Sequence, residues 1–334
     1  MDNRLYTLLD NAKKIAIFSH VDPDADALCS SFALKNIIKN NFDYKIVDVF
    51  VDGEIGDLYA PIMRDEVINP IPVSSYDIAF VLDCPNLSRI GIFADMAKNI
   101  PEIVNIDHHE TNSKFGTYNC ITKFVSSTCE LVYLIAKGQG FELNNLIAKE
   151  LYQGIITDTN CFTSINLTPR TQSVVSELMK YKFDANKIEA HYFKNNSAVK
   201  TNLLRKAIQS MKFYHNGMLI SMRLPNDVIT AIGASFEDTL GIIDKVMNLI
   251  NAQAGTLIIE KAPNYSHCSL RSKGIINVGD IATTFEGGGS ENQAAFQKYG
   301  KIEELEQSIV EAILAKLPDT PVTENPTDEF GKMY

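Results

Sequence analysis

The stretch IAIFSHVDPDADALCSSFALKNII, residues 15–38, predicts the fold of the first half of the chain. It begins with an apolar, β-branched run at Ile15–Phe18, passes through a polar loop and continues with helical spacing from Ala27 to Ile38. The same order recurs, with further strands predicted at 45–51, 78–82 and 103–106, and further helices at 127–137, 144–157 and 169–180. Strands that alternate with helices indicate an α/β fold, with a parallel sheet covered by helices on both faces.

The second half has a different pattern, which predicts a smaller α/β domain with a mixed sheet. At about 150 residues per domain, the 334 residues correspond to about two domains. We place a first domain at 1–190, a polar helical linker at 191–212 and a second domain at 213–334. Its strands are predicted at 218–223, 256–261 and 268–271, and its helices at 236–250, from 291 onward and at 303–316. The tail from 319 has Pro and Gly breakers and is expected to be poorly ordered.

Composition and charge argue against several classes of protein. The 31 Lys and Arg against 41 Asp and Glu give a net charge of -10, which does not match the basic surface of a duplex-DNA binder. No apolar run reaches the length of about 18 residues that predicts a membrane span, and no signal-peptide core follows the N-terminus. The six cysteines include no Cys-x-x-Cys pair and are expected to be reduced thiols. The expected location is the cytoplasm.

Polar clusters at the ends of the apolar runs contain the candidate functional residues. An isolated Asp after a strand is usually a turn former, and one carboxylate of the first loop could cap the helix that follows. However, the ends of parallel strands meet at one edge of a sheet, and carboxylates crowded there favour a divalent metal ion. The clusters are His20 with Asp22, Asp24 and Asp26, then Asp83, then Asp107-His108-His109, and then Asp158.

The order of these clusters resembles the four-motif signature of the DHH phosphoesterase superfamily. In this chain the signature is His20-x-x-x-Asp24-x-Asp26, Asp83, Asp107-His108-His109 and Asp158. The second half resembles the DHH-associated domain through Ser269-Leu270-Arg271-Ser272-Lys273 and Gly287-Gly288-Gly289 followed by Ala294-Ala295. Together these motifs span nearly the whole chain. Length and layout are similar to the nanoRNase and pAp-phosphatase group, whereas RecJ-type exonucleases and family II pyrophosphatases share the motifs of the first domain.

The resemblance implies a site for two divalent metal ions, with Mn²⁺ expected and Mg²⁺ or Co²⁺ as alternatives. Carboxylates and imidazoles suit such ions, although ligand type alone does not select one of them. The implied ligands are His20 and Asp24 for the first ion, Asp26, His108 and Asp158 for the second, and Asp83 as a bridge between both.

A catalytic role is implied for three residues of the same motifs. Asp83 would hold both ions, and His109 would face the substrate phosphate as hydrogen-bond donor or general acid. Asp107 would orient the histidine pair. Asp22 lies where the family often has Asn, so we expect it to shape the loop.

The implied substrate-binding residues lie in the second domain. Two divalent ions carry four positive charges against four carboxylates, so an anionic substrate needs cations from elsewhere, and Arg can bind phosphate with two parallel hydrogen bonds. Ser290 departs from the family, which usually has His there; a hydroxyl can donate a hydrogen bond but brings no charge. His267 is a nearby imidazole that could compensate. The full set is Ser269, Arg271, Ser272, Lys273, Gly287, Gly288, Gly289 and Ser290, with His109 from the first domain.

These inferences predict a metal-dependent phosphoesterase with its active site in the cleft between the domains. It would hydrolyse short oligonucleotides to 5′-mononucleotides, or the 3′-phosphate of pAp-like nucleotides. Short single strands or small nucleotides are the expected partners, because long strands need extended basic contact; a homodimer is one candidate assembly. The alternatives are a cyclic or linear dinucleotide phosphodiesterase, a polyphosphate or pyrophosphate hydrolase and, on the evidence of Ser290 alone, a non-enzymatic nucleotide-binding module.

Overall fold

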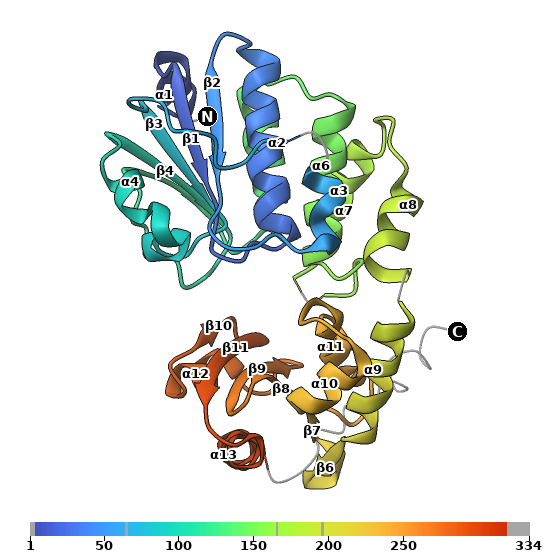
Figure 1. The fold of residues 1–334 in the computed structure, drawn as a ribbon. Coiled ribbons are helices and arrows are strands. Elements are labelled where there is room, and N and C mark those ends of the chain that lie inside the picture. Colours follow the sequence, from blue (N-terminus) through green and yellow to red (C-terminus); the bar gives the residue numbers. More distant parts are fainter. Residues whose placement is uncertain (1–3, 64–65, 165, 195–196, 319–334) are drawn as a thin grey trace. The chain divides into compact units, whose positions relative to one another are not determined.

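A computed structural model describes residues 4–63, 66–164, 166–194 and 197–318 (Figure 1). The chain divides into two compact units, residues 1–195 and 196–334, and each has its own sheet. The tail from 319, which we expected to be poorly ordered, lies outside the described residues.

The first unit contains a five-stranded sheet in the order β2-β1-β3-β4-β5, in which every pair is parallel. This confirms the predicted parallel α/β fold. The last strand was not predicted, because its four residues are all half-buried and form no apolar run. The strands are β1 (Lys14–Phe18), β2 (Ile46–Phe50), β3 (Ile78–Leu82), β4 (Glu102–Asp107) and β5 (Tyr118–Ile121).

Both faces of this sheet are covered, which explains why its central strands are continuously apolar. Successive side chains of a strand point to opposite faces, so Ile15 and Ile17 join one core while Ala16 and Phe18 join the other. The helices are α1 (Arg4–Asn11), α2 (Ala25–Asn41), α3 (Ala60–Met63), α4 (Ala94–Lys98), α5 (Thr128–Gln139), α6 (Asn145–Asp158), α7 (Pro169–Leu178) and α8 (Ala185–Glu189). Segments of 3-10 helix lie at η1 (Asp57–Tyr59) and η2 (Leu87–Phe93), and a π-helical segment lies at η3 (Ala190–Lys194).

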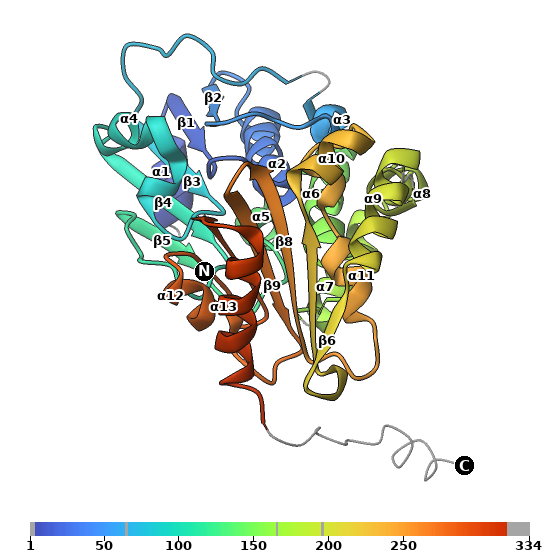
Figure 2. The ribbon, with the colours of Figure 1, turned by 60° about the horizontal axis from the view of Figure 1, so that its bottom comes forward.

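The second unit contains a six-stranded sheet in the order β10-β11-β9-β8-β7-β6. Three of its strands, β9, β8 and β6, are labelled in Figure 2. Only β7 and β8 pair in parallel, so the predicted mixed sheet is confirmed. The strands are β6 (Lys212–Tyr214), β7 (Leu219–Leu224), β8 (Ala254–Ala262), β9 (Tyr265–Ser272), β10 (Gly288–Gly289) and β11 (Gln293–Tyr299). The helices are α9 (Ala198–Gln209), α10 (Asn226–Ile232), α11 (Ile242–Met247), α12 (Val278–Thr284) and α13 (Ile302–Leu314), with short turns at η4 (His215–Gly217) and η5 (Glu237–Thr239).

Two helix predictions in this unit are wrong. The segment after Glu291 is strand β11, in which Ala294 and Phe296 are buried while the residues between them are more exposed. That period of two matches a strand paired with β9. The helix predicted over 236–250 is broken at Gly241, whose φ of +79° separates η5 from α11.

The residues predicted as a linker are divided between the two units. Leu203 and Ala207 of α9 are buried in the core of the second unit, so α9 belongs to that unit and is not a solvent-exposed connector. Residues 190–194 continue from α8 in the first unit. Within the described ranges no helix is both long and apolar enough to cross a membrane. All six cysteines lie in these ranges, and all are free thiols.

Candidate metal centre

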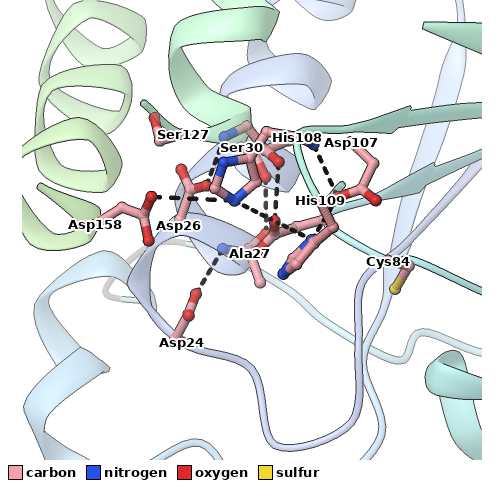
Figure 3. A network of polar contacts seen from close by, with 12 residues as sticks. Asp24, Asp26, Ala27, Ser30, Cys84, Asp107, His108, His109, Ser127 and Asp158 are labelled. Carbon is pink, nitrogen blue, oxygen red and sulfur yellow. Dashed lines mark hydrogen bonds and ion pairs between the residues drawn. The ribbon is translucent and has the colours of Figure 1, made fainter. Parts of the chain in front are cut away.

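Three groups of carboxylates and imidazoles converge at the carboxyl end of the parallel sheet. Within each group the potential ligand atoms lie within 4.8 Å of one another. Figure 3 shows the side chains around this centre as they extend from several elements toward one another. The groups are His20, Asp24 and Asp83; Asp26, His108 and Asp158; and Asp83, His108 and His109.

The loop after β1 supplies the first ligands. Asp24 is the N-cap of α2, where its Oδ1 accepts a hydrogen bond of 3.0 Å from the Ala27 amide. His20 Nδ1 lies 2.9 Å from the Val21 carbonyl, which leaves Nε2 facing Asp24 and Asp83 at 4.0 and 3.7 Å. Asp24 therefore caps the helix and belongs to the candidate metal site at the same time.

Asp22 differs from the other acidic residues of this loop because it is not a candidate metal ligand. Its backbone has a positive φ of 51°, and its amide donates to the Asp52 carbonyl at 3.1 Å. It belongs to none of the three candidate groups. These observations agree with its expected role in shaping the loop.

Asp26 is held by the start of a second helix. Its carboxylate accepts hydrogen bonds from the amides of Thr128 at 2.7 Å and Cys129 at 3.0 Å, where α5 begins. Free amides at a helix N-terminus favour a negative charge. Burial and the nearby carboxylates of Asp83 and Asp158 nevertheless raise the pKa of Asp26 well above its ordinary value. A nearby cation stabilises the ionised form of a carboxyl group whose pKa is raised in this way.

Asp83 lies between the two sets of ligands. Its Oδ2 faces His20 Nε2 at 3.7 Å and its Oδ1 faces His108 Nε2 at 3.5 Å, with the side chain 4% exposed. Thr128 Oγ1 donates a hydrogen bond of 2.9 Å to the same Oδ1. The residue follows β3 with a φ of +56°, a backbone that Asp tolerates better than most residues. Its two oxygens point to different ligand sets, as a bridging carboxylate requires.

The Asp107-His108-His109 segment ends strand β4. Asp107 is fully buried and receives hydrogen bonds from His109 Nδ1 at 2.7 Å and from Asn112 Nδ2 at 2.5 Å. Burial would raise the pKa of Asp107, but these hydrogen bonds outweigh it and lower the pKa. Burial would lower the pKa of His109. The hydrogen bond to Asp107 and the negative charge of Asp83 outweigh burial and raise the pKa of His109 to about 10. His109 is thus fixed by Asp107, with Nε2 as its remaining ring nitrogen.

Asp158 reaches the site from a helix, although its apolar run had suggested a strand end. It is the last residue of α6, and its Oδ2 lies 4.0 Å from His108 Nε2. Burial and the charges of Asp24 and Asp83 raise the pKa of Asp158. Residues of α2, α5 and α6 pack together, so a helix end can arrive at the same edge as the strand ends.

The donor set fits divalent cations. The three groups together bring four carboxylates and three imidazoles into one site. The neighbouring carboxylates raise the pKa of the buried Asp26 and of the partly exposed Asp158, as expected where negative charges crowd together. Hard oxygen ligands with imidazole suit Mn²⁺ and related ions.

Residues that the sequence reasoning missed hold these ligands in place. Thr128 binds both Asp26 and Asp83, Asn112 binds Asp107, and Asn166 Nδ2 lies 3.5 Å from Asp158 Oδ2. The one signal in the sequence was the Ser127-Thr128 pair that opens α5, a typical helix start.

The second unit presents part of the predicted substrate-binding set on one strand face. Ser269 and Arg271 alternate with buried residues along β9 and share a partly exposed face with His267. Arg271 Nε donates to Asp244 Oδ1 at 2.7 Å and Nη1 donates to the Leu270 carbonyl at 3.0 Å. The guanidinium is therefore held in one orientation.

Ser272 and Lys273 do not join this face. Ser272 lies on the buried side of β9, and its Oγ accepts from the amides of Gly274 and Ile276 at 3.1 and 3.4 Å. Lys273 Nζ donates to the Leu249 carbonyl at 2.8 Å. Their observed contacts thus stabilise the end of β9.

The glycine segment lies against β11: Gly288 and Gly289 form β10, which pairs with Ala295 and Ala294, and the chain turns after them at Ser290. A side chain at Gly287 would meet the Ala295 carbonyl, and one at Gly289, where φ is +150°, would meet the Gln293 carbonyl. Gly288 has open space around it. The Ser290 amide donates to the Gln293 carbonyl at 2.7 Å, and the exposed side chain lies over the same turn.

His267 does not replace the missing histidine at Ser290. Gln293, which closes the Ser290 turn, pairs with Arg271, whereas His267 pairs with Gln297. Four residues of strand separate these points, about 13 Å at the usual rise. Burial, with the charges of Lys261 and Arg271, also lowers the pKa of His267 to about 4, so the ring is neutral at physiological pH.

Comparison with known proteins agrees with this geometry. Residues 14–156 match the model of the DHH family, N-terminal domain. The chain is similar to the bifunctional oligoribonuclease and PAP phosphatase NrnA of Bacillus subtilis, with 25% identity over 82% of this chain and 86% of that protein. The NrnA of Thermus thermophilus is 26% identical over 91% and 90%. An exopolyphosphatase-related protein from Bacteroides fragilis has a similar crystal structure, with a TM-score of 0.86, 25% identity and coverage of 94% and 95%.

Proposed function

The chain belongs to the DHH family through its N-terminal domain, and on this premise we propose that it is a metal-dependent phosphoesterase of small nucleotides. The proposed reactions are hydrolysis of short oligonucleotides to 5′-mononucleotides and removal of the 3′-phosphate from pAp-like nucleotides. Relatives that are similar over more than four-fifths of the chain carry both activities in their names.

The observation that carries this proposal is the position of Asp83 between two ligand sets. Its two oxygens lie 3.7 Å from His20 and 3.5 Å from His108, on opposite sides of one carboxylate. We assign two divalent ions to this centre, with Mn²⁺ preferred, held by His20 and Asp24 on one side and by Asp26, His108 and Asp158 on the other. Such a pair of ions supplies a water of lowered pKa and positive charge for the phosphate oxygens.

His109 is assigned to the substrate phosphate. Asp107 holds its Nδ1, so its Nε2 is the nitrogen that remains to donate a hydrogen bond. Asp107 is in turn fixed by Asn112 and by the His108 amide, so that the imidazole has one orientation. A fixed donor costs less entropy on binding than a free side chain does.

The second unit is assigned a role in binding the nucleotide. Four carboxylates against two divalent ions leave the centre without excess positive charge, and the chain as a whole is acidic. Arg271 is the cation of the β9 face, and Ser269 and Ser290 are neighbouring hydroxyl donors. Charge-assisted hydrogen bonds from Arg to phosphate are among the stronger polar contacts.

A substrate panel tests the proposal against its alternatives. The full chain with Mn²⁺ is incubated with pAp, dinucleotides, five-nucleotide RNA, cyclic dinucleotides and pyrophosphate, and the products are separated by chromatography. The Asp83→Asn variant controls for contaminating hydrolases. We expect 5′-mononucleotides from the linear substrates and AMP with phosphate from pAp. Hydrolysis of pyrophosphate or cyclic dinucleotides alone would overturn the assignment.

A further inference from the structure

We propose that Asp244 is a positioning residue for substrate binding, acting through the guanidinium of Arg271. The inference rests on the proposed function, because it assumes that Arg271 binds a phosphate group of the nucleotide. Asp244 lies in α11, 27 residues before Arg271 in the sequence, and was not among the residues predicted from the motifs.

The contacts of Arg271 leave a defined set of donors free. Nε is bound to Asp244 at 2.7 Å and one Nη1 hydrogen to the Leu270 carbonyl at 3.0 Å. Among the described residues, Nη2 has no hydrogen-bond partner. A guanidinium has five N–H donors in a rigid plane, so three remain, and the two fixed contacts determine which way they point.

The packing of α11 explains how Asp244 reaches this position. Gly255 of β8 pairs with Arg271 in the sheet register. A side chain at Gly255 would meet the sulfur of Met247, one turn of α11 beyond Asp244. The absence of a side chain therefore lets α11 lie close to the sheet beside Arg271. Lys273, the next cation along β9, also binds this segment through the Leu249 carbonyl.

Burial makes the pair more than a surface ion pair. The Arg271 and Asp244 side chains are 22% and 30% exposed, so neither swings freely in water. A mobile Arg side chain loses considerable rotamer entropy when it binds a ligand. Asp244 removes that freedom before the nucleotide arrives. It also carries negative charge, which by itself would weaken the binding of a phosphate.

These two effects of Asp244 have opposite signs, so mutation separates them. If position dominates, Asp244→Ala raises KM for pAp and dinucleotides roughly tenfold with kcat within about twofold. Asp244→Asn retains an acceptor oxygen without the charge and is expected to keep KM near that of the wild type. Asp280→Ala is the matched control, since Asp280 is an exposed carboxylate of the same unit that forms no ion pair with described residues.

A double-mutant cycle identifies the route of the effect. Arg271→Ala is expected to raise KM at least as much as Asp244→Ala, and adding Asp244→Ala to Arg271→Ala is expected to change nothing further. The dissociation constant of 5′-AMP, measured by calorimetry, follows the same pattern and does not depend on turnover. Asp244→Glu, which moves the carboxylate by one methylene, provides an intermediate effect if the alanine variant is unstable.

Each result decides the proposal. An unchanged or lower KM in Asp244→Ala, or a tenfold effect that persists without Arg271, would overturn the positioning role and leave the proposed function intact. If Arg271→Ala binds 5′-AMP like the wild type, Arg271 is not the phosphate ligand and both assignments to the second unit fail. Loss of hydrolysis of every substrate with normal 5′-AMP binding would instead contradict only the proposed reaction.

Discussion

The candidate metal centre and the β9 face of the second unit are built in different ways. In the metal centre, Asp26, Asp83 and Asp107 are almost fully buried, and each accepts hydrogen bonds from fixed donors. In the second unit, Ser269 on the β9 face is partly exposed, and Ser290, in the turn that leads into β11, is exposed. There, Arg271 is the side chain with a fixed ionic partner.

We infer from this difference that the first region is built for the proposed reaction and the second for substrate selection. Buried carboxylates that repel one another have few arrangements that bind a cation, so a change in one ligand disturbs the others. Exposed hydroxyls on a turn can be exchanged with little effect on folding. Ser290, the departure from the family pattern, lies in the exposed region. Mutations should therefore have large effects in the first region and graded effects in the second.

Asp83→Asn is expected to have the largest effect. The amide keeps the shape and tolerates the left-handed backbone, but it cannot bridge two cations. We expect kcat/KM on pAp to fall by more than the roughly 10- to 100-fold caused by loss of an outer partner, with loss of bound Mn²⁺ by elemental analysis. Removing one of several like charges should leave the metal-free protein at least as stable.

Asp10→Asn is the control, because Asp10 is an exposed carboxylate in α1. A variant at Asp83 that retained its metal content and turnover would show that the two ligand sets act independently. The comparison between the two regions would then lose its main support.

Asp107→Asn should have the next largest effect. Loss of the carboxylate removes the main cause of the raised pKa of His109 and loosens its orientation, so kcat should fall roughly 10- to 100-fold. Metal content should change little, because Asp107 belongs to none of the three candidate groups. Steady-state kinetics beside Asp95→Asn, an exposed carboxylate of α4, provides the measurement and its control. Equal loss of metal and rate would place Asp107 among the ligands instead.

Glu150 tests what burial does to a carboxylate outside the metal centre. It is 3% exposed in α6, and burial raises its pKa to about 8 although Asn36 donates to it. The folded state then binds one more proton than the unfolded state between pH 4.5 and 8. The free energy of unfolding of the wild type must therefore fall as the pH rises through that window.

Glu150→Gln removes this dependence. Urea denaturation should show the variant to be more stable than the wild type by up to about 5 kcal/mol at pH 8.5, with a much smaller difference at pH 5. Turnover should not change. Parallel pH profiles for both proteins would mean that Glu150 stays ionised in the folded state.

Ser290→His should have the smallest effect. An imidazole at the exposed turn adds a charge that is present below its ordinary pKa of about 6.5. Exposed ion pairs contribute little, so kcat/KM for a nucleotide should rise roughly two- to fivefold at pH 6 and less at pH 8. Ser290→Asn, which is polar but does not titrate, controls for the size of the side chain. No gain for His at either pH would indicate that this turn does not contact the phosphate.

The sequence predicted most of the first unit and less of the second for a physical reason. Strands such as β1 and β3 lie between two cores and are continuously apolar, so they stand out in any window. Strand β11 has a second Ala, Ala295, between its buried Ala294 and Phe296, so its period of two does not show in the sequence, and the glycine segment before it resembled a loop that leads into a helix. Its identity as a strand comes from pairing with β9, which no local pattern contains.

The candidate site shows the same limit. The aspartates and histidines belong to short ordered motifs, and the structure brings them together. Thr128 is about 100 residues from Asp26, and Asp244 is 27 residues from Arg271. Neither has an unusual neighbourhood in the sequence. Residues that act by holding a ligand are found only when the fold places them beside it.

The left-handed backbone conformation at Asp83 limits the residue types that can replace it. Gly and Asn accept this φ but offer no anionic oxygen, and His accepts it more readily than most residues but binds through a single nitrogen. Glu has the right charge, yet it lacks the tolerance of Asp for this conformation. Asp alone combines the backbone with two anionic oxygens. Efforts to change the metal preference should therefore randomise His20, Asp24 or His108, and libraries that vary position 83 will consist almost entirely of inactive members.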